Sequence, residues 1–145
     1  MKTEMQVLDR LKEVIVSQLS KHYEEDGGQA DLAPISPLNV EIDFPDVDNM
    51  RKETMFYIEP DYENLDTLSM NSDIATMAVT VFIIVKGAKH ETLIRRVFGY
   101  FTALYCLLGK NRTLDGFIES TRMTDMDYYP AVTASTTMTA IEASL

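Results

Sequence analysis

The fold of this chain is decided by one uncharged stretch, Ile74-Ala-Thr-Met-Ala-Val-Thr-Val-Phe-Ile-Ile-Val85. Its β-branched residues predict a strand. A strand with one wet face alternates apolar and polar residues, but here both faces are largely apolar. We therefore expect the domain's own core on the side of Met77, Val79, Val81, Ile83 and Val85. The side that carries Thr76 and Thr80 is expected to meet loops or a neighbouring subunit.

The residues on either side of this stretch predict one α+β domain over residues 1–145. The expected sheet is mixed or antiparallel, has about five strands, and carries two main α-helices packed on one face. The predicted helices cover residues 3–23 and 90–108, and the further strands cover residues 38–44, 54–58, 114–123 and 140–145.

Apolar spacing predicts which helix faces are buried. In the first helix, Leu8, Leu11, Ile15 and Leu19 form one stripe. In the second helix, Arg95 and Arg96 are expected on the wet face. The main apolar stripe there is predicted to contain Leu93, Ile94, Val97, Phe98, Phe101, Leu104, Tyr105 and Leu108, with Tyr100 and Leu107 beside it.

Alternation in the segment Leu38–Phe44 predicts a half-buried strand that ends at Pro45, with Leu38, Val40, Ile42 and Phe44 inward. This strand and the strand at residues 54–58 are expected to form a hairpin. A long segment without a clear period, Glu59–Asp73, follows. Its apolar residues favour docking on this domain or on a neighbour.

The charge pattern narrows the classes of partner. The net charge is −10, and between Glu24 and Asp66 the only basic residues are Arg51 and Lys52. Such a surface repels phosphate, which disfavours ordinary nucleic-acid binding. No apolar run is long enough to cross a membrane, the first residues lack a signal-peptide pattern, and the single Cys106 suits a reducing compartment.

Motifs for catalysis and metal binding are absent from the sequence. There is no phosphate-binding glycine loop, no nucleophile elbow and no third histidine or cysteine for a zinc site. Cys106 is expected to be a small buried residue rather than a nucleophile. Asp125 and Asp127 are interpreted as turn residues, with a hard cation as the alternative. The sequence thus predicts a protein that is not an enzyme and has no cofactor and no metal.

The order of elements and two local motifs suggest a family. The second helix carries Arg95-Arg-Val-Phe-Gly-Tyr-Phe-Thr-Ala-Leu104, with Arg96 and Tyr100 one turn apart, and a strand closes on Thr124-Asp-Met-Asp-Tyr-Tyr129. With the amphipathic first helix and the acidic, proline-bearing loops, this pattern resembles the neck and tail proteins of long-tailed bacteriophages. The likeness is to the tail terminator or tail-completion family and covers nearly the whole chain.

The resemblance implies a non-enzymatic virion protein in the tail or neck, present in the host cytoplasm during assembly. It implies a homo-oligomer, commonly a hexameric ring, that caps the tail tube and joins it to a head-closure or connector protein. DNA would pass through the lumen without specific binding, and no membrane is involved. The interface residues expected are Tyr62, Leu65, Leu68, Met70, Thr76, Thr80, Arg95, Arg96, Asp125, Asp127, Tyr128 and Tyr129.

Two alternatives remain open at this point. One is another neck or baseplate adaptor, such as a head-closure or tail-joining protein. The other, from a different class, is a small ferredoxin-like ligand-binding regulatory module, which needs a pocket where polar groups converge.

Overall fold

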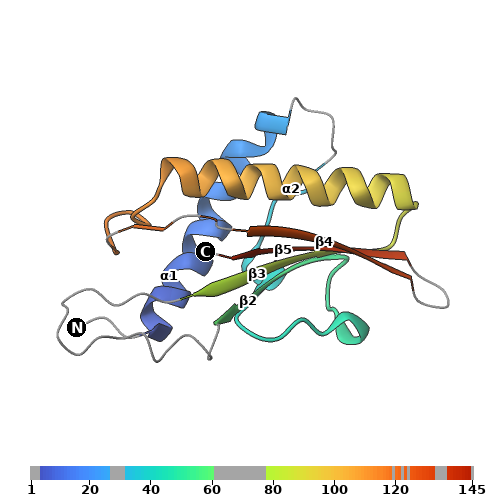
Figure 1. The fold of residues 1–145 in the computed structure, drawn as a ribbon, viewed down its shortest axis with the longest axis horizontal. Coiled ribbons are helices and arrows are strands. Elements are labelled where there is room, and N and C mark those ends of the chain that lie inside the picture. Colours follow the sequence, from blue (N-terminus) through green and yellow to red (C-terminus); the bar gives the residue numbers. More distant parts are fainter. Residues whose placement is uncertain are drawn as a thin grey trace.

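The computed structural model describes residues 4–26, 32–60, 78–118, 120, 121, 123, 125–132 and 137–144. Helices and strands alternate irregularly along the chain, as in an α+β domain (Figure 1). The elements are α1 (Glu4–Gln18), the 3-10 helices η1 (Leu19–Asp26), η2 (Pro37–Asn39) and η3 (Val47–Asn49), the strands β1 (Val40–Glu41), β2 (Thr54–Pro60), β3 (Val79–Val85), β4 (Asp125–Val132) and β5 (Thr137–Ser144), and α2 (His90–Lys110).

Within the described residues, the strands form one sheet in the order β1-β2-β3-β5-β4. β1 runs parallel to β2, and every other neighbouring pair is antiparallel. The register places Ile83 of β3 between Phe56 of β2 and Ile141 of β5. The predicted α+β class, with two helices and a mixed sheet, is confirmed.

The decisive stretch lies inside the sheet, with its two faces covered differently. β3 begins at Val79, and the earlier part of the predicted strand, up to Met77, lies outside the described residues. Val79, Val81, Ile83 and Val85 join the main core with both helices, as predicted. On the other face, Thr80 and Phe82 are only partly buried.

The second face of the sheet has its own small core. Met55, Tyr57 and Ile84 are buried there, and Met50 packs against them. The Tyr57 hydroxyl donates to the Asp46 carbonyl at 3.4 Å. In Figure 1 the segment that joins β1 to β2 lies on the side of the sheet away from α2. The chain's own residues therefore cover this part of the second face.

The apolar stripe of the first helix is buried as predicted. Leu8, Leu11, Ile15 and Leu19 are each at most 3% exposed. The α-helix ends at Gln18, and 3-10 geometry continues to Asp26, beyond the predicted end at Tyr23. η1 lies against α2, and three aromatic rings join these layers to the sheet. Tyr100 meets both Tyr23 and Phe56 edge to face.

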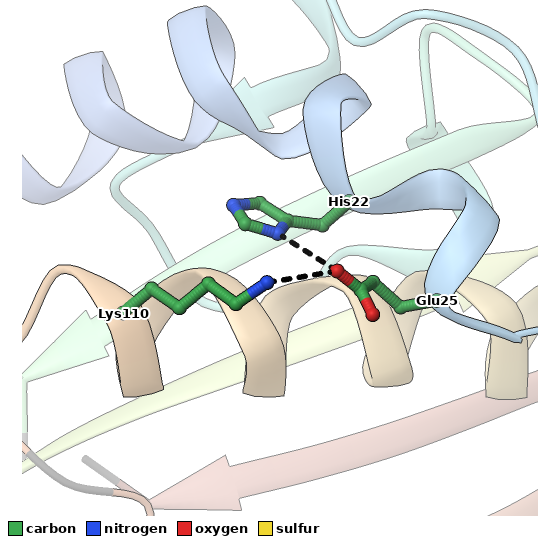
Figure 2. A network of polar contacts seen from close by, with 3 residues as sticks. All are labelled: His22, Glu25 and Lys110. Atoms are coloured by element: carbon green, nitrogen blue, oxygen red, sulfur yellow. Dashed lines mark hydrogen bonds and ion pairs between the residues drawn. The ribbon is translucent and has the colours of Figure 1, made fainter.

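A polar network fixes the end of η1 to the last turn of α2. Lys110 Nζ lies 2.9 Å from Glu25 Oε1, and His22 Nδ1 lies 3.8 Å from the same oxygen (Figure 2). The carboxylate thus faces two basic side chains, one from each element.

The predicted hairpin is wrong. β1 has two residues and pairs in parallel with β2, and Leu38 and Phe44 are 58% and 60% exposed. Local hydrogen bonds explain the difference, since Asn39 Oδ1 accepts from the amide of Ser36 while Asn39 Nδ2 donates to the Thr54 carbonyl. These bonds hold a 3-10 turn where alternation alone predicts a strand.

The predicted strand at residues 114–123 is also wrong. Leu114, Asp115 and Gly116 have φ values of 49°, 62° and 82°, which no strand accommodates. Asp115 accepts hydrogen bonds from Asn111 and from Gln18 of α1, so side chains stabilise a turn here. A strand occurs later in the chain instead. It is β4 (Asp125–Val132), which includes the segment Asp125–Pro130, where the sequence predicts a turn.

Candidate functional site

A cavity of about 420 Å³ lies between the segment 33–35, the start of β2 and the inward side of α2. It is partly open to solvent, and its volume falls within the about 300–1,000 Å³ that is typical of small-molecule pockets. Its lining residues are Ala33, Pro34, Ile35, Asn39, Lys52, Glu53, Thr54, Arg96 and Tyr100.

Arg96 is the unexpected member of this lining. It follows Leu93 by three residues and precedes Tyr100 by four, and both of these residues are buried. Residues at these spacings share one side of a helix, so Arg96 lies on the inward side of α2 and its predicted place on the wet face is wrong. Its neighbour Arg95 is on the wet face, where its guanidinium pairs with Glu91 at 3.1 Å.

Arg96 is partly buried, and one atom of its guanidinium group lacks a partner in the protein. Its Nε atom is buried and has no hydrogen-bond partner. None of the ion pairs among the described residues involves it. A buried donor without a hydrogen bond carries a desolvation penalty, so the Nε–H group of Arg96 opposes the stability of the fold.

The tyrosines around the cavity serve the scaffold. The Tyr23 hydroxyl donates to the Ala33 carbonyl at 2.7 Å, and the Tyr100 hydroxyl accepts from the Ala33 amide at 3.2 Å. Burial raises the pKa of Tyr23 well above its ordinary value, so the hydroxyl keeps its proton. These bonds hold the segment 33–35 as a wall. The charged groups that line the cavity are Arg96, Lys52 and Glu53.

Glu53 is positioned by a glycine in the turn between β3 and α2. Gly87 has a φ of +88°, and a Cβ added there would lie 2.6 Å from Glu53 Oε1. The backbone beside it is also fixed, since the Lys86 amide donates to the Glu53 carbonyl at 2.9 Å. The missing side chain of Gly87 therefore makes room for the Glu53 carboxylate at the edge of the cavity.

A second candidate surface is the outer row of α2, which we define as Ile94, Phe98, Phe101 and Tyr105. These residues recur every three or four positions, and the sequence predicted all of them in the buried stripe. Instead, Phe98 is 39% and Tyr105 is 60% exposed, and Ile94 and Phe101 are partly buried. The rings of Phe101 and Tyr105 lie 6.5 Å apart at 33°.

The core of α2 uses a different set of residues. Leu93, Val97, Tyr100, Ala103, Leu104, Leu107 and Leu108 are buried. Cys106, predicted to be buried, is partly exposed. Two stripes of apolar residues run along this helix. One stripe is buried in the core, and Phe101 of the outer row also packs against the core.

The predicted interface residues that the structure describes lie on the sheet and on α2. Thr80 is partly buried on the second face of the sheet, opposite Ser144 in register, and Ser144 pairs in turn with Asp125 of β4. Arg95 and Arg96 lie on different sides of α2. The residues predicted between 62 and 76, which are Tyr62, Leu65, Leu68, Met70 and Thr76, lie outside the described residues. Asp125, Asp127, Tyr128 and Tyr129 are consecutive or near-consecutive members of β4, paired with β5.

The described residues contain neither a candidate metal site nor a candidate membrane span. No group of three or more histidine, cysteine or acidic residues within them is arranged to hold a metal ion. No helix in this part of the chain combines the length and apolar character needed to span a membrane. Comparison with known proteins is equally silent, since no family model, no curated protein and no solved structure matches the chain.

Proposed function

We propose that this protein is a non-enzymatic structural protein of a bacteriophage virion. In this proposal it forms a homo-oligomeric ring, commonly hexameric, which caps the tail tube and joins it to the head. The observation that supports it best is the outer row of α2, where two aromatic side chains lie substantially exposed. A surface of this kind favours cover by another protein.

The outer row has the character of a contact between subunits. The rings of Phe101 and Tyr105 contact each other in a tilted arrangement, 6.5 Å apart, so together they present a joint aromatic surface to a partner. Aromatic side chains are enriched at the centres of protein interfaces. A head-to-tail contact through such a surface generates a closed ring when its rotation closes.

The body of each subunit would be a five-stranded sheet with α1 and α2 on one face. Phe101 of the outer row packs against this body, while Phe98 and Tyr105 are 39% and 60% exposed at the surface of α2. The net charge of −10 supports a further part of the proposal, that DNA passes the ring without sticking to it.

An assembly assay tests the proposed function. Purified protein is mixed with phage tail tubes that lack a terminator, and the tubes are imaged by negative-stain electron microscopy. We expect one ring at a single end of each tube and tubes that no longer lengthen. Binding along the tube wall, or no binding at concentrations where the protein is folded, would contradict the proposal.

The assay has a matched pair of variants. Tyr105→Ser removes an aromatic ring of the outer row, and Met5→Ser removes another exposed apolar side chain, 54% exposed, from α1. End-capping should be lost with the first variant and kept with the second.

A further inference from the structure

We propose that the cavity beside Arg96 is a binding site for a carboxylate group, with the Arg96 guanidinium as its anchor. This inference goes beyond the proposed ring, because it assigns a ligand chemistry to a site on the opposite side of α2 from the outer row.

The first argument is the position of Arg96. Its side chain starts on the inward side of α2, its Nε atom is buried, and the protein supplies no hydrogen-bond partner for that atom. An apolar residue there would avoid the desolvation penalty of the unpaired Nε–H group. Side chains that oppose the stability of the fold are concentrated at functional sites, so this arginine is assigned to a ligand.

The second argument identifies the ligand group. A guanidinium presents a planar fork of donors that matches carboxylate and phosphate oxygens in a bidentate manner. Lys52 adds a second positive charge to the lining, and Glu53 adds one negative charge. The lining therefore carries a single net positive charge, which balances one carboxylate better than a doubly charged phosphate.

The remaining surfaces suggest the rest of the ligand. Pro34 and Ile35 provide apolar wall, and Tyr100 lines the cavity from α2. Glu53, held at the edge beside Gly87, accepts hydrogen bonds. A compact organic acid that also carries a donor group, such as an amine or a hydroxyl, would pair its carboxylate with Arg96 and its donor with Glu53.

The carboxylate has two possible sources. It belongs either to a small organic acid or to an acidic side chain of a second copy of this chain, which has 23 acidic residues. The chemistry at Arg96 is the same in both cases, and one experiment separates them.

The experiment is isothermal titration of the full chain with L-glutamate, succinate and inorganic phosphate, with light scattering of the same samples. Arg96→Met removes the anchor, and Arg96→Lys keeps the charge but not the planar fork. Arg95→Met is the matched control, because Arg95 is an exposed arginine that is not part of the cavity lining. Thermal unfolding of each variant reports on the fold.

If the ligand is a small acid, we expect L-glutamate or succinate to bind more tightly than phosphate. Arg96→Met should then lower the affinity for that acid roughly tenfold or more. The molar mass of the protein should not change. For an acidic side chain of a second copy, we expect no heat from free acids and a lower molar mass in Arg96→Met. In both cases Arg95→Met behaves as wild type, Arg96→Lys is intermediate, and Arg96→Met unfolds at the wild-type temperature or above it.

Three results would overturn the inference. The first is that neither binding nor molar mass depends on Arg96. The second is that phosphate binds at this site in preference to the carboxylates. The third is that Arg96→Met and Arg96→Lys both unfold well below wild type, since the guanidinium would then stabilise the fold itself.

Discussion

Tyr100 of α2 meets Phe56 of β2 edge to face, with ring centroids 5.6 Å apart and ring planes at 84°. Both side chains are at most 1% exposed, so the contact between α2 and the sheet is fully buried at this point. The same Tyr100 turns its hydroxyl to the Ala33 backbone and lines the cavity. One residue therefore connects the core to the candidate site.

This contact predicts that two substitutions reduce the free energy of unfolding by different amounts. Phe56→Ala leaves a cavity in the core and should cost about 3–5 kcal/mol of unfolding free energy. Tyr100→Phe keeps the ring and removes the hydroxyl bonds to Ala33, so it should cost about 1 kcal/mol. Denaturant unfolding measures both. Equal losses would mean that the hydroxyl, rather than the rings, holds the layers together.

Alanine substitutions at Gly109, Gly116 and Gly87 should change the stability of the protein by different amounts. Gly109 lies in α2 with open space around an added Cβ, so Gly109→Ala should stabilise the protein by up to about 1 kcal/mol. Gly116 has the same open space but a φ of +82°, so Gly116→Ala should destabilise it by about 1–2 kcal/mol.

Gly87→Ala combines a φ of +88° with a contact to Glu53. The loss of stability should at least equal that of Gly116→Ala, and the Glu53 carboxylate should be displaced, since its flexible end yields before the backbone does. Chemical denaturation ranks the three variants, and a structure of Gly87→Ala locates Glu53. A Gly109→Ala variant less stable than the other two would contradict this reasoning.

The contact in Figure 2 predicts acid sensitivity. The hydrogen bond and charge of Lys110 hold the pKa of Glu25 below its ordinary value of 4.5. A carboxyl whose pKa is lower in the folded state contributes stability at neutral pH and loses it as pH falls through that lowered pKa. Glu25→Gln should therefore reduce the decline in stability below about pH 4.5.

The control is Glu25→Gln in a protein in which its ion-pair partner, Lys110, is already replaced. In a Lys110→Gln background, Glu25→Gln should leave the acid limb of the stability curve almost unchanged. Urea titrations from pH 3 to 7 compare the four proteins. An undiminished effect of Glu25→Gln in that background would assign the acid sensitivity to some other contact.

The parts of the fold that follow apolar spacing could be predicted from the sequence. The buried stripe of α1 and the core-facing side of β3 were both found this way. Where side chains bond to the backbone, spacing failed. Asn39 Oδ1 accepts from the Ser36 amide inside an alternating segment, and Asn111 Oδ1 accepts from the Asp115 amide in the turn before β4.

The candidate site could not be predicted because two readings of α2 were possible. Its apolar residues form two stripes, and the spacing alone does not say which one meets the sheet. Adjacent residues on a helix point about 100° apart, so Arg95 and Arg96 cannot both lie at the centre of the solvent-exposed face of α2. A helical projection centred on Tyr100 rather than Phe101 would have placed Arg96 inward.

The molar mass in solution tests the proposed ring most directly. Size-exclusion chromatography with light scattering compares the wild type with Tyr105→Ser and Met5→Ser. We predict a mass several times that of the 16.4 kDa chain for wild type and Met5→Ser, and a fall toward one chain for Tyr105→Ser. A wild-type mass of 16.4 kDa at every concentration, or a Tyr105→Ser variant that keeps the full oligomer, would contradict the proposal that the outer row of α2 joins copies of this protein.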